Sequence, residues 1–181
     1  TLTVTGIVVL DKVYDGTVSS TVMTNTIAYE GLAAGDNVYI DTSSGVFTDA
    51  NVGLGKTVNL TNTYAGTDLA NYTLVNQTTT TASITVKAIT IIPTASQSKT
   101  YGVADATLSY TISPSTLPGG TAISLGGTLS RTLGENAGTY SITMGTVSDT
   151  NYEITLSPET FAINKKTITV SGVTAGDKVY D

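Results

Sequence analysis

Residues 1–15 read TLTVTGIVVLDKVYD and residues 167–181 read TITVSGVTAGDKVYD, so the two ends of the chain carry the same pattern 166 positions apart. Thr, Val and Ile are frequent in both segments, and such β-branched side chains favour extended backbone. Self-similarity at a fixed spacing is typical of proteins built from tandem modules. The pattern therefore predicts a modular, all-β chain in which residues 167–181 begin a further copy of the first module.

A second repeat lies inside the first. Asn71-Tyr72 is matched by Asn151-Tyr152, 80 positions later, and Lys12-Val13-Tyr14 is matched by Lys99-Thr100-Tyr101. The matching motifs follow one another in the same order in both halves of the chain. The sequence therefore predicts two diverged modules of similar length.

The expected module boundaries follow from these matches. We expect one module at residues 1–87, a second at residues 88–166, and the start of a third at residues 167–181. No flexible linker separates the first two, because Lys87-Ala88 runs directly from one strand candidate into the next. The expected architecture is two tandem Ig-like β-sandwich modules in an elongated rod.

Short strand candidates are separated by turn signals. Gly, Asn and Asp interrupt the runs of Thr, Val, Ile and Tyr, and these residues tolerate the positive φ that tight turns require. The pattern predicts strands at Leu2–Val9 and Thr121–Leu125, a turn at Ser44-Gly45 and a single helical turn at Asp68–Asn71. Many short strands with regular turn signals are typical of a sandwich or a barrel.

The composition excludes several kinds of chemistry. The 181 residues include 8 basic and 14 acidic side chains, a net charge of -6, and no Cys, His or Trp. Without Cys or His the chain has no thiol nucleophile, no Ser-His-Asp relay and no His-based metal site. The acidic balance argues against a nucleic-acid partner, and no apolar run is long enough for a membrane helix. We therefore assign no catalytic, cofactor-binding or metal-binding residue, and we expect that the protein is not an enzyme.

Several motifs resemble those of two bacterial repeat families. In the first module, the motifs that resemble the YDG domain are Asp11-Lys12-Val13-Tyr14-Asp15-Gly16, Ala34-Gly35-Asp36 and Ala70-Asn71-Tyr72-Thr73-Leu74. In the second module, the motifs that resemble the MBG domain of the YGX type are Lys99-Thr100-Tyr101-Gly102, Gly127-Thr128-Leu129-Ser130-Arg131 and Asn136-Ala137-Gly138-Thr139-Tyr140. Residues 167–181 resemble the opening of another YDG domain.

This resemblance implies a role outside the cell. It implies a secreted bacterial surface protein of the filamentous-haemagglutinin or large-adhesin type, active in cell adhesion and biofilms. The implied function is a non-enzymatic stalk or spacer that projects a distal binding region, with neighbouring repeats as partners and a host glycan or protein bound by another region. The alternative is a carbohydrate- or host-protein-binding β-sandwich module, which would need an exposed aromatic patch or a pocket with converging polar groups.

Recurring carboxylates have two interpretations. Asp11 and Asp15 return as Asp177 and Asp181. They could supply oxygen ligands to calcium near a module junction, or Asp15 could accept backbone N–H groups in a turn, which is the interpretation we favour. The segment Asp49–Gly53 is similar in part to a calcium loop but lacks its closing Glu.

Recurring tyrosines also have two interpretations. Tyr14, Tyr101 and Tyr180 occupy one matched position, and Tyr72 and Tyr152 occupy another. They could form a platform on which sugars stack, or they could pack in the core with the hydroxyl bonded to nearby backbone, as in a tyrosine corner. Their periodic recurrence favours the core interpretation.

Two further expectations concern the absence of disulfides and the fate of residues 167–181. Small domains without disulfides have limited cores, so a spontaneous amide bond between Lys12 and Asn71 is a hypothesis worth testing by mass spectrometry.

Residues 167–181 carry apolar side chains without the rest of their module. They either lack fixed structure beyond about Thr169 or add to the edge of a sheet, either of the second module or of another molecule, and we expect edge addition.

Overall fold

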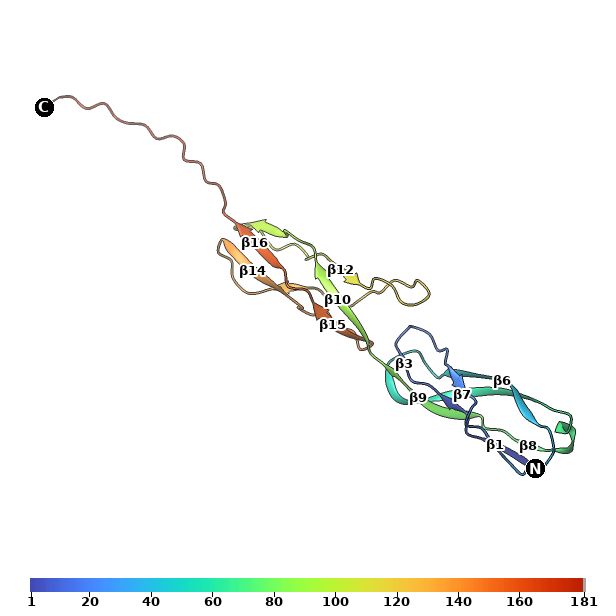
Figure 1. Cartoon of the computed structure of the whole chain (residues 1–181). Helices are drawn as coiled ribbons and strands as arrows, with labels where there is room; N and C mark the ends of the chain where they lie inside the picture. The colour runs from blue at the N-terminus through green and yellow to red at the C-terminus, as the bar shows by residue number, and fades with distance from the viewer. Residues whose placement is uncertain (181) are drawn as a thin grey trace. The chain divides into compact units, whose positions relative to one another are not determined.

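The computed structural model describes residues 1–180 and shows an all-β protein (Figure 1). Its chain divides into two compact units. Unit 1 contains residues 1–90, 112–125 and 148–155, and unit 2 contains residues 91–111 and 126–147 and the described residues from 156 onward. The expected module boundary at residues 87 and 88 stays a prediction.

The first half of the chain forms strands and one short helix. They are β1 (Leu2–Thr5), β2 (Val8–Val9), β3 (Lys12–Val13), β4 (Val22–Met23), β5 (Ala28–Glu30), β6 (Tyr39–Phe47), β7 (Gly53–Ala65), the 3-10 helix η1 (Leu69–Asn71), β8 (Leu74–Val75) and β9 (Thr79–Thr85). The helix confirms the helical turn predicted at Asp68–Asn71.

The second half forms seven further strands. They are β10 (Lys87–Pro93), β11 (Ser98–Thr100), β12 (Tyr110–Ser113), β13 (Ser130–Arg131), β14 (Gly138–Thr143), β15 (Tyr152–Leu156) and β16 (Thr160–Asn164). Residues 165–180 contain no strand, so the expected addition of this segment to an edge of the second module is wrong for the described residues. The strand predicted at Thr121–Leu125 is wrong, because only an isolated bridge joins Ala122 to Thr116 there.

Unit 1 is built around a four-stranded sheet with the order β3-β9-β7-β6, whose strands are labelled in Figure 1. A smaller sheet has the order β5-β1-β8. In the larger sheet β9 and β6 both run antiparallel to β7. The turn predicted at Ser44-Gly45 is wrong, because β6 continues through these residues and pairs with Thr61 and Leu60 of β7.

Glycine divides the predicted first strand. Gly6 has a φ of 83°, and a Cβ added there would lie 2.2 Å from the carbonyl oxygen of Thr26. Only glycine combines this backbone conformation with so close an approach. The single strand predicted at Leu2–Val9 is therefore two strands, β1 and β2, which pair with different partners.

Three clusters of buried apolar side chains stabilise unit 1. The first cluster is Ile7, Val9, Phe47, Val58, Leu60, Ala82 and Ile84. The second cluster is Leu2, Val4 and Val38. The third cluster is Ile89, Leu117 and Ile123. Alternating strand residues supply these side chains, because successive residues of a strand point to opposite faces.

Unit 2 contains the four-stranded sheet β11-β16-β14-β13. The buried apolar residues of this unit are Ile91, Leu108, Leu129, Ile142, Val147, Phe161 and Ile163. Two of them, Phe161 and Ile163, alternate along β16, where the burial pattern is that of a strand with one face in the core. This sheet positions the charged side chains described next.

Candidate functional site

Unit 1 pairs its Lys-x-Tyr segment with its last strand. Strand β3 runs parallel to β9, with Lys12 opposite Ile84. The backbone N–H of Tyr14 donates to the carbonyl oxygen of Thr85 at 2.8 Å. Residues near the start of unit 1 are thus bonded side by side to a strand seventy residues further along the chain.

Unit 2 repeats this pairing of strands. Strand β11 runs parallel to β16, with Lys99 opposite Ile163. The backbone N–H of Tyr101 donates to the carbonyl oxygen of Asn164, again at 2.8 Å. The sequence repeat Lys-x-Tyr is therefore a structural repeat. We call each of these pairs, β3 with β9 and β11 with β16, a parallel clamp.

The Lys12 side chain closes a turn. Its Nζ donates to Asp15 Oδ1 at 2.8 Å and to the carbonyl oxygen of Thr17 at 2.7 Å, and it lies 5.5 Å from the centre of the Phe47 ring. Asp15 Oδ1 also accepts the backbone N–H of Thr17 at 2.9 Å. Partial burial opposes ionisation of Asp15, but the hydrogen bonds from Lys12 and Thr17 outweigh it and hold the pKa of the carboxyl below its usual value.

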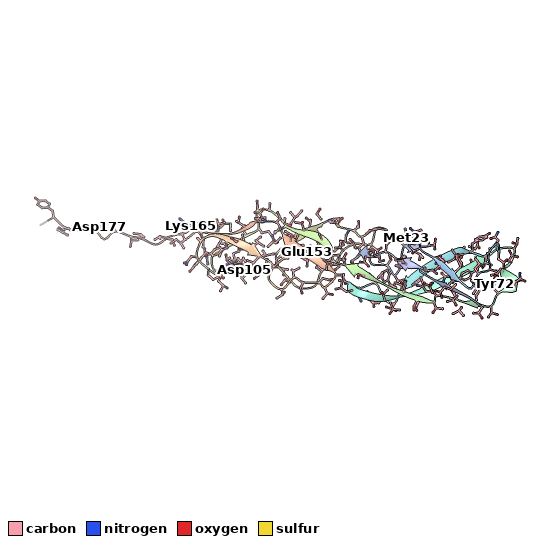
Figure 2. All side chains as sticks on the ribbon, turned by 60° about the horizontal axis from the view of Figure 1, so that its bottom comes forward. Met23, Tyr72, Asp105, Glu153, Lys165 and Asp177 are labelled. Carbon is pink, nitrogen blue, oxygen red and sulfur yellow. The ribbon has the colours of Figure 1, made fainter. Side chains whose placement is uncertain are left out.

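These contacts confirm the turn interpretation of Asp15. Asp11 is also bonded within the protein, since its Oδ1 accepts the backbone N–H of Ser83 at 2.6 Å. Asp49 Oδ1 accepts Lys56 Nζ at 2.6 Å. Among residues 1–180, no group of three or more Asp or Glu side chains forms a metal-ligand set. Asp177 lies in the stretch without strands (Figure 2), and Asp181 lies outside the described residues.

Unit 2 contains a network of four charged side chains, which we call the ion network: Lys99, Asp105, Arg131 and Glu135. Lys99 Nζ lies 2.7 Å from Asp105 Oδ1 and 2.5 Å from Glu135 Oε2. Arg131 Nε lies 2.8 Å from Asp105 Oδ2, and its Nη2 lies 2.7 Å from Glu135 Oε1. Each cation therefore bridges both carboxylates. Figure 2 labels Asp105 among the side chains of unit 2.

The two cations of the ion network are buried under protein atoms. The side chains of Lys99 and Arg131 are 5% and 6% exposed, whereas those of Asp105 and Glu135 are 40% and 69% exposed. The Arg131 guanidinium also stacks 4.9 Å from the centre of the Tyr140 ring. Such contacts fix the plane of the guanidinium group. The two buried cations therefore hold the carboxylates in place at the surface.

Mutual hydrogen bonding keeps all four groups of the ion network charged. The bonds from Arg131 and then Lys99 lower the pKa of Asp105, and those from Lys99 and then Arg131 lower the pKa of Glu135. The bonds to Asp105 and then Glu135 raise the pKa of Lys99. A protonated amine is not a nucleophile or a general base, so the ion network is suited to structure and to hydrogen bonding.

Three of the recurring tyrosines pack as the core interpretation predicts. The rings of Tyr14 and Tyr152 meet edge to face with centroids 5.4 Å apart. Tyr72, labelled in Figure 2, packs against the second cluster, donates its hydroxyl to Asp36 Oδ2 at 2.6 Å and accepts the backbone N–H of Ala33 at 2.9 Å. These hydroxyl bonds to a backbone group and a carboxylate anchor the Tyr72 ring.

The core interpretation is wrong for the other two tyrosines. Tyr101 is 48% exposed, and Tyr180 lies almost fully exposed in the stretch without strands. Tyr101 occupies the second position of a turn in which the Val103 N–H donates to the Thr100 carbonyl oxygen at 3.1 Å. Gly102 follows it with a φ of 82°, as a type II turn requires. The turn places the Tyr101 ring at the surface rather than in a core.

The structure does not bring together Lys12 and Asn71. Lys12 lies beside Phe47 of the first cluster, where its Nζ contacts Asp15 and Thr17. Asn71 ends η1, whose Leu69 packs on the second cluster. An amide bond between the two residues therefore has no support in their surroundings.

Sequence reasoning missed the ion network. In the sequence Lys99 stands out only as part of a repeat, and Asp105 and Glu135 lie in segments with no recurring acidic motif. One signal was available, because Arg131 is the single arginine of the chain, and arginine is the cation best suited to bridge two carboxylates. The partners themselves come together only through the pairing of β13, β14, β16 and β11.

Comparison with known proteins identifies two domains. Residues 1–82 match the family model of the YDG domain, and residues 89–162 match that of the MBG domain (YGX type). No curated protein and no solved structure matches the chain. In the described part of the chain, no helix has the length and apolar character needed to cross a membrane.

Proposed function

We propose that this chain, a YDG domain followed by an MBG domain of the YGX type, is a non-enzymatic stalk or spacer of a bacterial extracellular adhesin. In this proposal it stands at the cell surface, joins neighbouring repeats of the same protein and projects a distal binding region. Each domain would be an Ig-like β-sandwich, and the domains would follow one another in a rod. The two family matches are compatible with such repeat proteins.

The parallel clamps are the observation that carries the proposal. In a parallel pair the two strands start at the same end, so a force on the start of β11 and an opposite force on the end of β16 act along the strands. All hydrogen bonds of the pair then resist together in shear, whereas an antiparallel pair loaded at one end opens one bond at a time. A segment that must transmit tension is therefore more resistant to unfolding when a parallel pair is loaded in shear.

The two strands of each clamp lie far apart in the sequence and enclose most of their domain. Paired residues of β3 and β9 are 72 positions apart, as in Lys12 and Ile84, and those of β11 and β16 are 64 apart, as in Lys99 and Ile163. Most of each domain is therefore enclosed between its clamp strands. Tension entering from the carboxyl side of a domain therefore reaches β9 or β16 directly, whereas on the amino side it first crosses β1 and β2 in unit 1 and β10 in unit 2. Strand β1 adds a further parallel pair in unit 1, because Leu2 lies opposite Leu74 of β8.

Single-molecule force spectroscopy on the full chain tests this proposal with a matched pair of variants. Tyr101→Pro removes the N–H that donates to Asn164, while proline suits the second position of a type II turn. Its effect on the preceding residue is small, because Thr100 is already extended in β11. Tyr101→Ala removes the ring but keeps the N–H.

We expect the unfolding force of unit 2 to fall in Tyr101→Pro and to stay near the wild-type value in Tyr101→Ala. The unfolding event of unit 1 serves as the internal reference in both variants. Equal forces for the two variants would contradict the shear argument and remove the main support for a stalk.

A further inference from the structure

A surface hollow of about 470 Å³ lies beside the ion network in unit 2. Its lining includes Lys99, Tyr101, Val103, Asp105 and Glu135. This volume falls within the range of small-molecule sites. The turn that carries Tyr101 and Gly102 forms one wall, and the carboxylates of the ion network form another.

The carboxylates of the hollow are preorganised hydrogen-bond acceptors. Lys99 and Arg131 hold Asp105 and Glu135 from the buried side, at distances of 2.5 to 2.8 Å. A carboxylate has about four lone-pair sites, so each keeps acceptor capacity on its exposed side. Groups fixed in this way lose little freedom when a ligand binds, which favours affinity.

The wall of the hollow that is formed by the turn carries one aromatic ring, that of Tyr101. The Tyr101 side chain is exposed, although its counterpart in unit 1, Tyr14, is packed edge to face against another ring. The Tyr101 N–H is bonded to Asn164, so the backbone beneath the ring is held in place. An exposed ring on a fixed turn offers a flat apolar face for a ligand.

The charge of the ion network sums to zero, because two cations face two anions. A charged ligand therefore gains no net attraction there. An anion would meet Lys99 and Arg131 only behind the carboxylates, and a metal ion would meet two carboxylates already paired with cations. The chemistry that fits is neutral, donates several hydrogen bonds and has an apolar face.

We propose that this hollow is a binding site for a neutral sugar, with a pyranose ring stacked on Tyr101 and neighbouring hydroxyl groups donating to Asp105 and Glu135. Sugars combine an apolar C–H face with rows of hydroxyl donors, which match these two walls. The proposal adds a binding activity to the MBG domain and does not depend on the stalk function.

The test is saturation-transfer NMR and calorimetry on the full chain with neutral disaccharides: cellobiose, maltose, lactose, chitobiose and mannobiose. Sialyllactose serves as the charged comparison. We expect at least one neutral disaccharide to bind and Tyr101→Ala to weaken it at least about tenfold, or about 1.4 kcal/mol. Tyr101→Phe should keep most of the affinity, because the ring face remains.

Tyr39→Ala is the matched control, because Tyr39 is 49% exposed but lies in unit 1. It should leave binding unchanged. Far-ultraviolet circular dichroism checks that each variant is folded. If Tyr101→Ala is not, Tyr101→Leu replaces it, because leucine keeps apolar bulk but lacks the aromatic face. The proposal is overturned if no neutral disaccharide binds, if only sialyllactose binds, or if Tyr39→Ala weakens binding as much as Tyr101→Ala.

Discussion

Replacement of Ile84 by alanine should destabilise unit 1 strongly. Ile84 is fully buried in the first cluster and lies in β9, between Lys12 of β3 and Gly53 of β7. Its side chain therefore supports the parallel clamp from the core side. No charged or hydrogen-bonded group is removed with it, so the loss is one of apolar packing alone.

The size of the effect follows from the atoms removed. Ile to Ala deletes the equivalent of about three methylene groups, worth about 0.8 kcal/mol each in transfer free energy. The residual cavity adds to this, and measured substitutions of the kind cost about 2–5 kcal/mol. We expect about 3 kcal/mol, which lowers the Tm of a domain of about 100 residues by about 12 °C.

Scanning calorimetry of the full chain measures this change. Thr81→Ala is the control, because Thr81 lies in the same strand with its side chain exposed, and it should cost less than about 1 kcal/mol. The transition assigned to unit 1 should move and that of unit 2 should stay. A Tm shift for Ile84→Ala no larger than that of the control would refute the placement of Ile84 in a packed core.

Three further predictions concern a glycine, a carboxylate and a covalent bond. Gly6→Ala should lower the Tm by more than Gly35→Ala, because both residues have positive φ but only Gly6 would clash with backbone. The pKa of Glu135 is lowered in the folded chain, so its stabilising effect is present above its ordinary value of 4.5 and is lost as the pH falls through the folded value. The Tm difference between wild type and Glu135→Gln, measured from pH 7 to pH 3, should therefore shrink at the acid end; a constant difference would contradict a charge effect. Intact mass spectrometry should give the unmodified mass, and a loss of one ammonia molecule traced to Lys12 and Asn71 would contradict their separation.

The sequence predicted the all-β class and the repeat because both depend on residue types and spacing alone. The Lys-x-Tyr motif, for example, recurs wherever a clamp strand forms. The parallel direction of the clamps could not be predicted, because Ile84 and Ile163 are indistinguishable from other strand residues until the sheet is assembled. Pairing over sixty or seventy residues leaves no local signal.

The candidate site was harder to predict than the fold. Tyr14 and Tyr101 occupy matched positions in the sequence, yet one packs against a ring and the other lies at the surface. Asp15 follows Tyr14, whereas Gly102 follows Tyr101, and that glycine permits the turn that exposes the ring. The sequence repeat therefore does not specify whether the tyrosine at this position lies in the core or at the surface, because that depends on the local backbone conformation.

The placement of the basic residues has a consequence for digestion by proteases that cut after Lys or Arg. The side chains of Lys12, Lys56, Lys99 and Arg131 are all at most 16% exposed and are engaged in ion pairs. Lys165 and Lys166 are exposed and lie where no strand protects the backbone. A trypsin-like enzyme should therefore cut first in this stretch, after Lys165, Lys166 or Lys178, which is also exposed. The paired strands before Lys165 should resist it for as long as they stay folded.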